Sequence, residues 1–144
     1  MKGRKEKTMV RDDCIFCKLA NGVYPTNTIY EDDEFRVFLD LSPATKGHCL
    51  IVPKDHYANL SEISDEASAK VLPLAKKIMG MLKEKLNCEG LNLVQNNGEI
   101  AGQTVFHFHM HVIPRYMGDG QLIGWKPQTP EEGEIEKTLK EIVG

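Results

Sequence analysis

The chain contains no long run of apolar residues, and this absence excludes the common membrane-directing segments. No stretch approaches the roughly 20 apolar residues that a membrane-spanning helix needs. The first thirteen residues are rich in Lys and Arg, but they include no apolar segment of the roughly 7–15 residues that a signal peptide contains. We therefore expect a cytoplasmic protein without a membrane partner.

A large excess of one charge is also absent. The 18 Lys and Arg residues against 21 Asp and Glu residues give a formal net charge of −3, which argues against a general nucleic-acid-binding protein. The length of 144 residues predicts one compact domain. We expect residues 1–13 to form a flexible, charged extension and residues 14–144 to form the domain, with a C-terminal tail and helix from about residue 118.

Hydrophobic spacing and turn residues predict an α+β domain with a mainly antiparallel sheet. Ser64 is the expected N-cap of a long helix over residues 65–86, in which Pro73 should produce a kink. A helical turn is expected to end near Asn21. A second helix is expected to open on a capping box at Thr129, with Pro130 at its first position. The five predicted strands are 29–30, 35–39, 48–53, 91–96 and 105–113.

The most informative segment is HFHMHVI, over residues 107–113. Strand side chains alternate between faces, so His107, His109 and His111 should share one face. Phe106, Phe108, Met110 and Val112 should form the core-facing side. Three solvated histidines on an exposed face are the alternative to a functional site.

A single metal ion bound by all three histidines does not fit a strand. At about 3.3 Å per residue the outer two would lie about 13 Å apart along the backbone, whereas metal–nitrogen bonds measure about 2.0–2.1 Å. A division of labour is favoured instead, with one histidine available to a metal and another acting as a nucleophile near neutral pH. The preceding segment NNGEIAGQT offers glycine backbone, an amide and a hydroxyl, which suit a phosphate; an ordinary strand connection is the alternative.

These motifs carry a resemblance to a known family. HFHMHVI resembles the histidine-triad signature, and the blocks DLSPATKGHCLIVPKDH and NNGEIAGQTVFHFHMHVIPR resemble further characteristic segments in the same order. From about Cys14 to Trp125 the chain is similar to the histidine-triad (HIT) nucleotide-binding hydrolases, most closely the Hint-like branch and related bacterial proteins. The resemblance implies a HIT-like five-stranded sheet with a long helix and a two-fold homodimer.

The resemblance also implies roles for individual residues. His109 would attack the α-phosphorus of a purine nucleoside 5′-phosphoryl compound and form a covalent nucleotidyl-histidine. His111 and His48 would contact the phosphate, and Gln103 and Thr104 would donate hydrogen bonds to it. Asp40 would hold the ribose hydroxyls, and Asn96 would organise the loop on the ribose side. The complete implied nucleotide-binding set is Ile15, Phe16, Phe38, Leu39, Asp40, Leu41, Asn96, Gly102, Gln103, Thr104, His109 and His111.

A structural zinc ion is the cofactor that the resemblance implies. Cys14 and Cys17 form a CxxC pair, for which thiol packing and redox chemistry are alternative explanations. The resemblance supplies His56 and His107 as the other two ligands, which would complete a closed tetrahedral site. Cys49 and Cys88 are expected to be small buried residues. Because no carboxylate pair for Mg²⁺ is evident, turnover should survive EDTA at short times.

The first functional hypothesis is a nucleoside phosphoramidase or adenylate hydrolase. Cleavage of dinucleoside polyphosphates is the alternative enzymatic function, and uridylyl transfer is disfavoured because His111 is retained. A non-catalytic nucleotide-binding regulatory dimer is the alternative from another class. The leaving group and the base remain open at this level.

Overall fold

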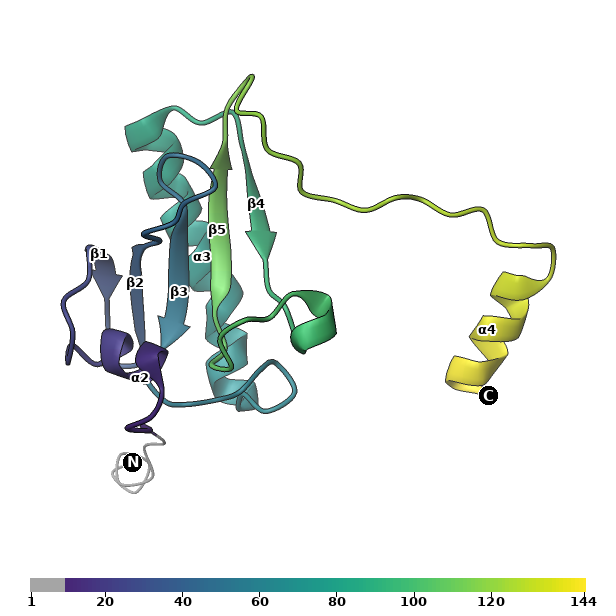
Figure 1. Cartoon of the computed structure of the whole chain (residues 1–144), viewed down its shortest axis with the longest axis horizontal. Coiled ribbons are helices and arrows are strands. Elements are labelled where there is room, and N and C mark those ends of the chain that lie inside the picture. Colours follow the sequence, from purple (N-terminus) through teal and green to yellow (C-terminus); the bar gives the residue numbers. More distant parts are fainter. Residues whose placement is uncertain (1–9) are drawn as a thin grey trace.

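The computed structural model describes residues 10–144, so most of the predicted flexible extension lies outside the described residues. Five strands form one sheet in the order β1-β2-β3-β5-β4, and every neighbouring pair is antiparallel (Figure 1). The prediction of a five-stranded antiparallel sheet is therefore confirmed. The strands are β1 (Thr28–Glu31), β2 (Phe35–Leu39), β3 (Cys49–Pro53), β4 (Gly90–Val94) and β5 (Met110–Arg115).

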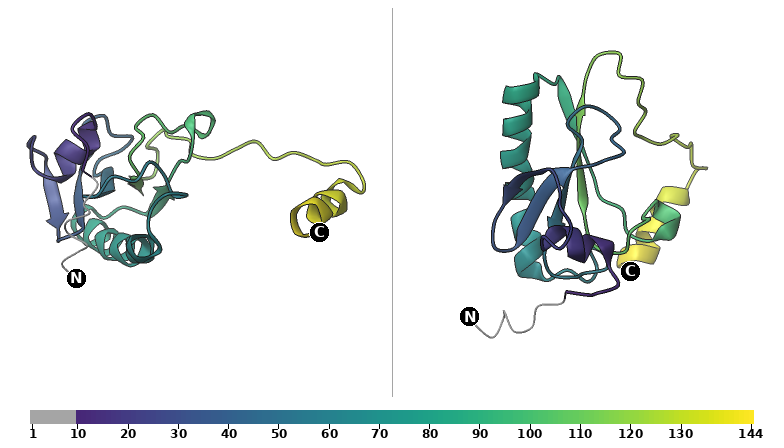
Figure 2. Two further views of the ribbon diagram at one scale, coloured as in Figure 1. Left: turned by 90° about the horizontal axis from the view of Figure 1, so that it is seen from below. Right: turned by 60° about the vertical axis from the view of Figure 1, so that its left-hand side comes forward.

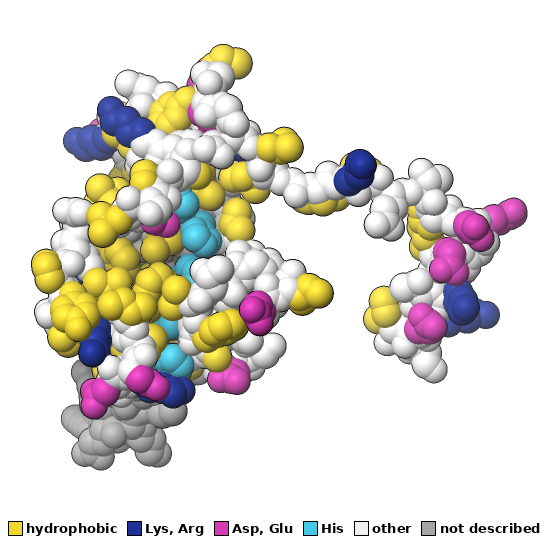
Figure 3. Space-filling view, in the orientation of Figure 1, with side chains coloured by type: hydrophobic (Ala, Val, Ile, Leu, Met, Phe, Trp, Pro, Cys, Tyr) yellow, Lys and Arg dark blue, Asp and Glu magenta, His cyan; other side chains and the backbone are white. Residues whose placement is uncertain are grey.

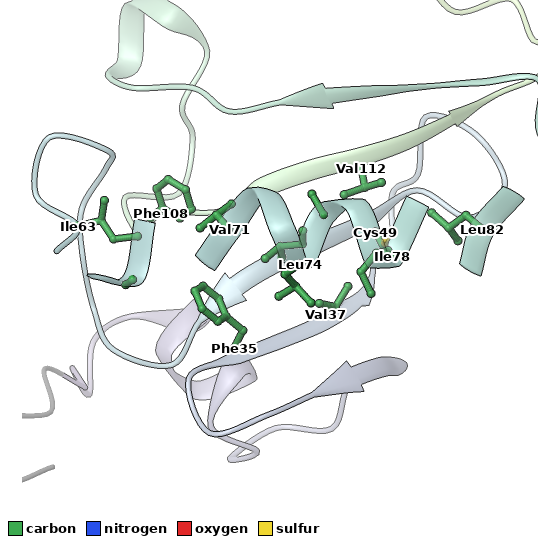
Figure 4. Packing of buried hydrophobic residues seen from close by; sticks show 13 residues of the cluster. Phe35, Val37, Cys49, Ile63, Val71, Leu74, Ile78, Leu82, Phe108 and Val112 are labelled. Atoms are coloured by element: carbon green, nitrogen blue, oxygen red, sulfur yellow. The ribbon is translucent and has the colours of Figure 1, made fainter. Parts of the chain in front are cut away.

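One face of the sheet is covered by helix α3 (Asp65–Leu86), whose bounds agree with the prediction. The Ser64 hydroxyl accepts a hydrogen bond from the backbone N–H of Ala67 and so caps the first turn. Pro73 lies inside the helix without ending it. The buried face of α3 packs against side chains of β2, β3 and β5 (Figure 4), and this cluster includes Val71, Leu74, Ile78, Phe35, Val37, Phe108 and Val112.

The other face carries the short helix α2 (Ile15–Ala20), so the domain has three layers (Figure 2). Phe16, Leu19 and Ala20 of this helix contact a second apolar cluster formed by Phe38, Leu50 and Val52. Alternation along β2 explains the two clusters, since Val37 faces α3 while Phe38 faces α2. The rings of His107 and His109 contact Phe16 and therefore lie on this second side.

The predicted strand 105–113 begins later than expected, at Met110. The ladder with β3 ends because Pro53 has no N–H, and its carbonyl accepts a hydrogen bond from the His107 ring at 2.8 Å. The Phe108 N–H instead donates to the carbonyl of Tyr57 at 2.6 Å. Phe108 is buried as predicted, but Phe106 is 51% exposed, which corrects its assignment to the core.

The C-terminal helix also begins later than predicted. Helix α4 (Glu134–Val143) follows Gly133, which has φ of +86° and provides no side-chain cap, so the predicted capping box at Thr129 is wrong. A residue in the left-handed region interrupts any helix that would begin at Pro130. All residues from 121 to 144 are exposed, and α4 lies away from the domain at the end of an extended segment (Figure 1).

The connection between β4 and the histidine segment borders the site. Residues 99–101 form a single 3-10 turn between β4 and the histidine segment. Strand β4 ends at Val94, so Gln95 and Asn96 belong to this connection rather than to the predicted strand. No helix within residues 10–144 has both the length and the apolar character required to cross a membrane.

Candidate active site and metal centre

His109 lies along the chain between His107, which belongs to a cluster of cysteines and histidines, and His111, which lines a cavity. Its Nδ1 is 2.7 Å from the backbone carbonyl oxygen of His107. A carbonyl only accepts, so Nδ1 must carry the hydrogen and donate it. The lone pair of the neutral ring therefore resides on Nε2. Burial lowers the pKa of His109, which favours this neutral, nucleophilic form at pH 7.

Phe16 of α2 fixes the position of the His109 ring. The two ring centroids are 4.8 Å apart in an edge-to-face arrangement, and the His107 ring lies 6.1 Å from the same phenylalanine. His111 follows on β5 with its ring centroid 5.1 Å from that of His109. The rings of His109 and His111 are thus neighbours, and those of His107 and His109 both contact Phe16, although only His111 belongs to a regular strand. Figure 3 shows histidine side chains in a line on this face, beside a broad group of hydrophobic side chains.

His48 precedes β3 and lies next to His111. Its Nε2 is 3.0 Å from Nδ1 of His111 and 3.6 Å from a carboxylate oxygen of Asp40. Only 6% of His48 is exposed. Burial lowers the pKa of His48, and it lowers the pKa of His111 to about 4, with a further contribution from the neighbouring histidines.

A cavity of about 330 Å³ opens beside His109 and His111. This volume is within the range of about 300–1,000 Å³ typical of small-molecule sites. Eight of the predicted nucleotide-binding residues line it: Phe16, Phe38, Leu39, Asp40, Leu41, Thr104, His109 and His111. The structure therefore gathers the apolar residues, the carboxylate and two histidines around one space.

Other residues of the predicted site lie outside the cavity wall. Ile15, Asn96, Gly102, Gln103 and His48 are not among its lining residues. Gln103 is 2% exposed, and its amide is used within the protein. It donates to the carbonyls of Ala58 and Val105 and accepts from the N–H of Gly98. The side chain of Gln103 thus holds the shape of the loop, and Asn96 supports the same loop by donating to the carbonyl of Gly102.

Sequence reasoning missed six lining residues: Leu19, Pro25, Thr26, Asn27, Leu50 and Val105. Leu19 lies three residues after Phe16, so helical spacing alone would have placed both on one face. Leu50 is paired with His111 across β3 and β5, a relation that requires the sheet register. The loop residues 25–27 carry no comparable signal.

The predicted metal ligands lie together at the other end of the histidine line. Cys14 Sγ is 3.3 Å from Nδ1 of His107, and Cys17 Sγ is 3.4 Å from Nδ1 of His56. One ligand atom from each of the four residues lies within 4.8 Å of every other. Zn–S bonds of about 2.3 Å and Zn–N bonds of about 2.0–2.1 Å at tetrahedral angles place such atoms about 3.5 Å apart. The donor set and its spacing therefore fit zinc.

The surrounding contacts prepare these groups for a metal. His107 Nε2 donates to the carbonyl of Pro53, which leaves the lone pair on Nδ1, facing the thiols. The Arg11 N–H donates to Cys17 Sγ at 3.3 Å. Burial raises the pKa of the Cys17 thiol to about 11 and lowers that of His107 to about 4. A cation would offset the cost of a buried thiolate.

Comparisons with known proteins agree with this geometry. The family model described as HIT domain matches residues 21–118. Adenosine 5'-monophosphoramidase hnt1 of Schizosaccharomyces pombe is 43% identical over 122 residues, covering 83% of this chain and 89% of that protein. Among solved structures, a HIT family protein from Bacillus anthracis has a TM-score of 0.82 at 39% identity, covering 91% of this chain and 95% of that one.

A further solved structure bears on the cysteine and histidine cluster. A Zn-bound histidine triad family protein from Mycobacterium smegmatis has a TM-score of 0.73 at 38% identity. The match covers 81% of this chain and 84% of the mycobacterial chain.

Proposed function

Because the chain belongs to the HIT family and is a hydrolase of that family, we propose that it cleaves purine nucleoside 5′-phosphoramidates and adenylates through a covalent nucleotidyl-histidine at His109. The observation that carries the proposal is the hydrogen bond from His109 Nδ1 to the His107 carbonyl. That bond leaves the Nε2 lone pair on a ring that lines the 330 Å³ cavity. A neutral imidazole so placed is a nucleophile at pH 7.

The reaction has two steps. In the first, Nε2 of His109 attacks the α-phosphorus, a nitrogen–phosphorus bond forms, and the bond from phosphorus to the leaving group breaks. The leaving group departs with the bonding electron pair and takes up a proton. In the second, a water molecule attacks the same phosphorus and loses a proton, the bond to His109 breaks, and the nucleoside monophosphate is released.

The cavity wall supports binding of the rest of the nucleotide. Phe16, Phe38 and Leu50 supply apolar surface for a planar base. One oxygen of the Asp40 carboxylate accepts the Ser42 N–H at 2.8 Å, which fixes the carboxylate and leaves the other oxygen as an acceptor for ribose hydroxyls. Thr104 carries a hydroxyl and lines the same cavity as His109.

Cys14, Cys17, His56 and His107 would hold the structural zinc ion. A zinc ion held there would cross-link the N-terminal end of α2 to the histidine segment, and four protein ligands would leave no position for a substrate. Because Phe16 lies between Cys14 and Cys17, and His107 is itself a member of the cluster, this cross-link would hold Phe16 and the His107 carbonyl in place beside His109.

We also propose a two-fold homodimer formed at strand β4. Within the described chain, β4 and β1 are the edges of the sheet. The register of β1 shifts between Thr28 and Tyr30, whereas β4 pairs regularly over five residues. Irregular edges resist further pairing, so β4 is the edge suited to a second copy. Light scattering on purified protein tests this, because a monomer at micromolar concentration would contradict it.

Intact-mass measurement with a substrate panel tests the catalytic proposal. The panel contains adenosine phosphoramidate, an aminoacyl adenylate and a dinucleoside polyphosphate. Rapid quenching of the wild-type protein and either of the first two substrates in denaturant at alkaline pH, where a phosphorus–nitrogen bond to histidine survives, should reveal a nucleotidyl adduct. If only the dinucleoside polyphosphate is cleaved, the leaving-group assignment is wrong. If the protein binds AMP but cleaves no member of the panel, the regulatory dimer is the better description.

The variant His109→Ala provides the matched control. It should form no adduct and should lose at least about 10³-fold in turnover, because it lacks the nucleophile. AMP should still bind within a few-fold of the wild-type affinity, as measured by calorimetry, since the apolar wall and Asp40 are unchanged. Turnover that persists in this variant would refute His109 as the nucleophile.

A further inference from the structure

The connection between β2 and β3 has no regular secondary structure, yet it borders the nucleotide cavity. This loop, residues 40–48, runs from the end of β2 to the start of β3, and its residues Asp40 and Leu41 line the cavity. The N–H of Ser42 in the same loop donates to the Asp40 carboxylate at 2.8 Å. The position of that carboxylate therefore depends on the path of the loop.

Two side chains from the segment after β5 hold the backbone of this loop. The Tyr116 hydroxyl donates to the carbonyl of Lys46 at 2.7 Å. The Gln121 side-chain amide donates to the carbonyl of Ala44 at 3.0 Å. The partners are 70 and 77 residues apart in the sequence, so both bonds form only in the folded protein. Because both bonds use carbonyls, they leave the N–H groups of the loop free to hold Asp40.

Asp119 organises the turn that carries both donors. Its two oxygens accept hydrogen bonds from Nε and Nη2 of Arg115 at 2.8 and 2.9 Å, the bidentate geometry of a strong ion pair. They also accept the N–H groups of Tyr116 and Gln121, each at 3.0 Å. The hydrogen bonds from Arg115 hold the pKa of the Asp119 carboxyl well below its ordinary value. The carboxylate therefore fixes the backbone of the same two residues whose side chains hold the loop.

Arg115 in turn anchors this structure to the sheet. It is the last residue of β5, and its Nη1 donates to the side-chain oxygen of Asn92 on β4 at 2.9 Å. Its Nη2 also donates to the carbonyl of Gln121 at 2.7 Å. A turn that only ended β5 would be complete with these bonds. The Tyr116 hydroxyl and the Gln121 amide are additional, and both are directed at the loop 40–48.

We propose that Tyr116 and Gln121 are positioning residues that hold the loop 40–48 in the path that Asp40 needs to bind the ribose hydroxyls. The inference deepens the proposed function and rests on it for the identity of the ligand. Hydrogen bonds between hydroxyls and oxygen acceptors require donor–acceptor distances of about 2.5–3.0 Å, so a carboxylate displaced by about 1 Å no longer makes them. Loss of the two bonds to the loop should therefore weaken the ribose contact in particular.

Calorimetry with two nucleotides measures the ribose contact by itself. AMP and 2′,3′-dideoxyadenosine 5′-monophosphate have the same base and phosphate, but only AMP has the hydroxyls that Asp40 would bind. The wild-type protein should bind AMP about 10–100-fold more tightly, the fold-change that corresponds to hydrogen bonds with a charged group. The ratio of the two affinities is the quantity to compare between variants.

The double variant Tyr116→Phe with Gln121→Glu removes both donors and nearly preserves the size of each side chain. We expect the affinity ratio to fall at least about fivefold, while the bond from the Thr45 hydroxyl to the Pro114 carbonyl keeps the loop attached. The charge added by Gln121→Glu acts alike on two ligands with the same phosphate, so it cancels from the ratio. Gln128→Glu makes the same change on the exposed arm and should retain the wild-type ratio.

Two results would overturn the proposal. An unchanged ratio in the double variant would show that Asp40 does not depend on these bonds. Equal weakening of both nucleotides would show that the bonds are merely structural. If the double variant does not fold, Tyr116→Phe alone decides the matter, because loss of one bond should still lower the ratio by at least about twofold.

Hydrogen exchange of the full-length protein, measured by mass spectrometry, separates this inference from the proposed function. The amides of residues 41–48 should exchange faster in the double variant than in the wild type, and at the wild-type rate in Gln128→Glu. Unchanged exchange would overturn the proposal even if the protein binds no nucleotide. A wild-type protein that binds the two nucleotides equally, with faster loop exchange in the double variant, would instead refute the ribose role of Asp40 in the proposed function.

Discussion

At the scale of single residues, the histidines of the site are built to be neutral. Burial lowers the pKa of His48, His109 and His111, and the last falls to about 4. The hydrogen bonds of these rings with the His107 carbonyl, with the Ala44 N–H and between His48 and His111 each use one ring nitrogen as a donor or an acceptor. These bonds therefore require a neutral ring in one particular tautomer. This requirement makes protonation costly for folding as well as for chemistry.

The pH dependence of stability follows from these lowered pKa values. Between pH 6.5 and about 4, the unfolded chain binds a proton at the position of His111 that the folded chain does not bind. The free energy of unfolding should therefore fall as the pH falls through this range, by up to about 1.4 kcal/mol per pH unit for each such proton. In His111→Asn the slope, measured by urea unfolding, should be shallower by up to one proton. Identical slopes in the two proteins would contradict the shift, and the slopes above pH 7 serve as the control.

Gly47 directly precedes His48, and its backbone conformation helps to determine where His48 lies. It has φ of +92°, and a Cβ there would lie 2.4 Å from Leu86 Cδ1 and 3.2 Å from Pro114 Cγ. Gly47→Ala should lower the free energy of unfolding by about 2 kcal/mol or more, because left-handed backbone alone costs about 1–3 kcal/mol for such a residue. Urea unfolding measures the loss, with Gly80→Ala on α3, where a Cβ meets nothing within 4 Å, as the control. A Gly47→Ala protein as stable as the wild type would show that the loop adapts.

At the scale of elements, helix α2 connects the metal cluster to the nucleotide cavity. Cys14 and Cys17 provide sulfur to the cluster, while Phe16 between them contacts the His109 ring and lines the cavity. The His107 segment makes a parallel connection, since its side chain belongs to the cluster and its carbonyl orients His109. Loss of a metal ion or a ligand at the cluster should therefore alter the position of His109 in two ways, through Phe16 and through the His107 carbonyl.

Removal of the proposed zinc ion tests this connection. Prolonged chelation, or the variant Cys17→Ser, should lower Tm by several degrees and weaken AMP binding, because Phe16 and the His107 carbonyl lose their anchor. Brief exposure to EDTA should leave turnover unchanged, because a zinc ion bound by four protein ligands has no free position for the substrate. Calorimetry with AMP and thermal unfolding provide the measurements. Cys88→Ser, at a buried cysteine outside the cluster, controls for loss of a thiol. Immediate loss of turnover with the fold intact would make the zinc catalytic.

At the scale of the whole molecule, the domain and the C-terminal arm are separate. The domain is a three-layer unit, whereas residues 121–144 bury no side chain, and α4 projects from the β4 side of the molecule (Figures 1 and 2). The last links between arm and domain are hydrogen bonds at Gln121, which joins the arm to Arg115 and Ala44.

Deletion of residues 122–144 should therefore leave the folded domain intact. At low protein concentration, we expect the free energy of unfolding of the truncated protein, measured with urea, to match that of the full chain within about 0.5 kcal/mol. This is the range for changes at exposed positions. Circular dichroism should show only the loss of the α4 signal. A strongly destabilised truncation would mean that the arm packs on the domain or on a second copy.

Local signals in the sequence determined the long helix and the candidate chemistry. The cap at Ser64 and the apolar spacing define α3, and the alternation of His107, His109 and His111 identified the reactive segment, because both depend on residues that are close in the chain. The zinc ligands and the nucleotide-binding set required more, and came from resemblance to a family. The boundary of β5 was wrong because Pro53, 54 residues from His107, ends the ladder.

Only the tertiary structure decided how the site residues act on one another. His48 and His111 are 63 residues apart, and no local pattern states which nitrogen of each ring faces the other. Gln103 was expected to donate a hydrogen bond to the phosphate. In the fold its amide donates to the carbonyl of Ala58, 45 residues away in the sequence. Sequence fixes which chemical groups a chain possesses, whereas their protonation and hydrogen-bond partners depend on contacts that form only when distant segments pack together.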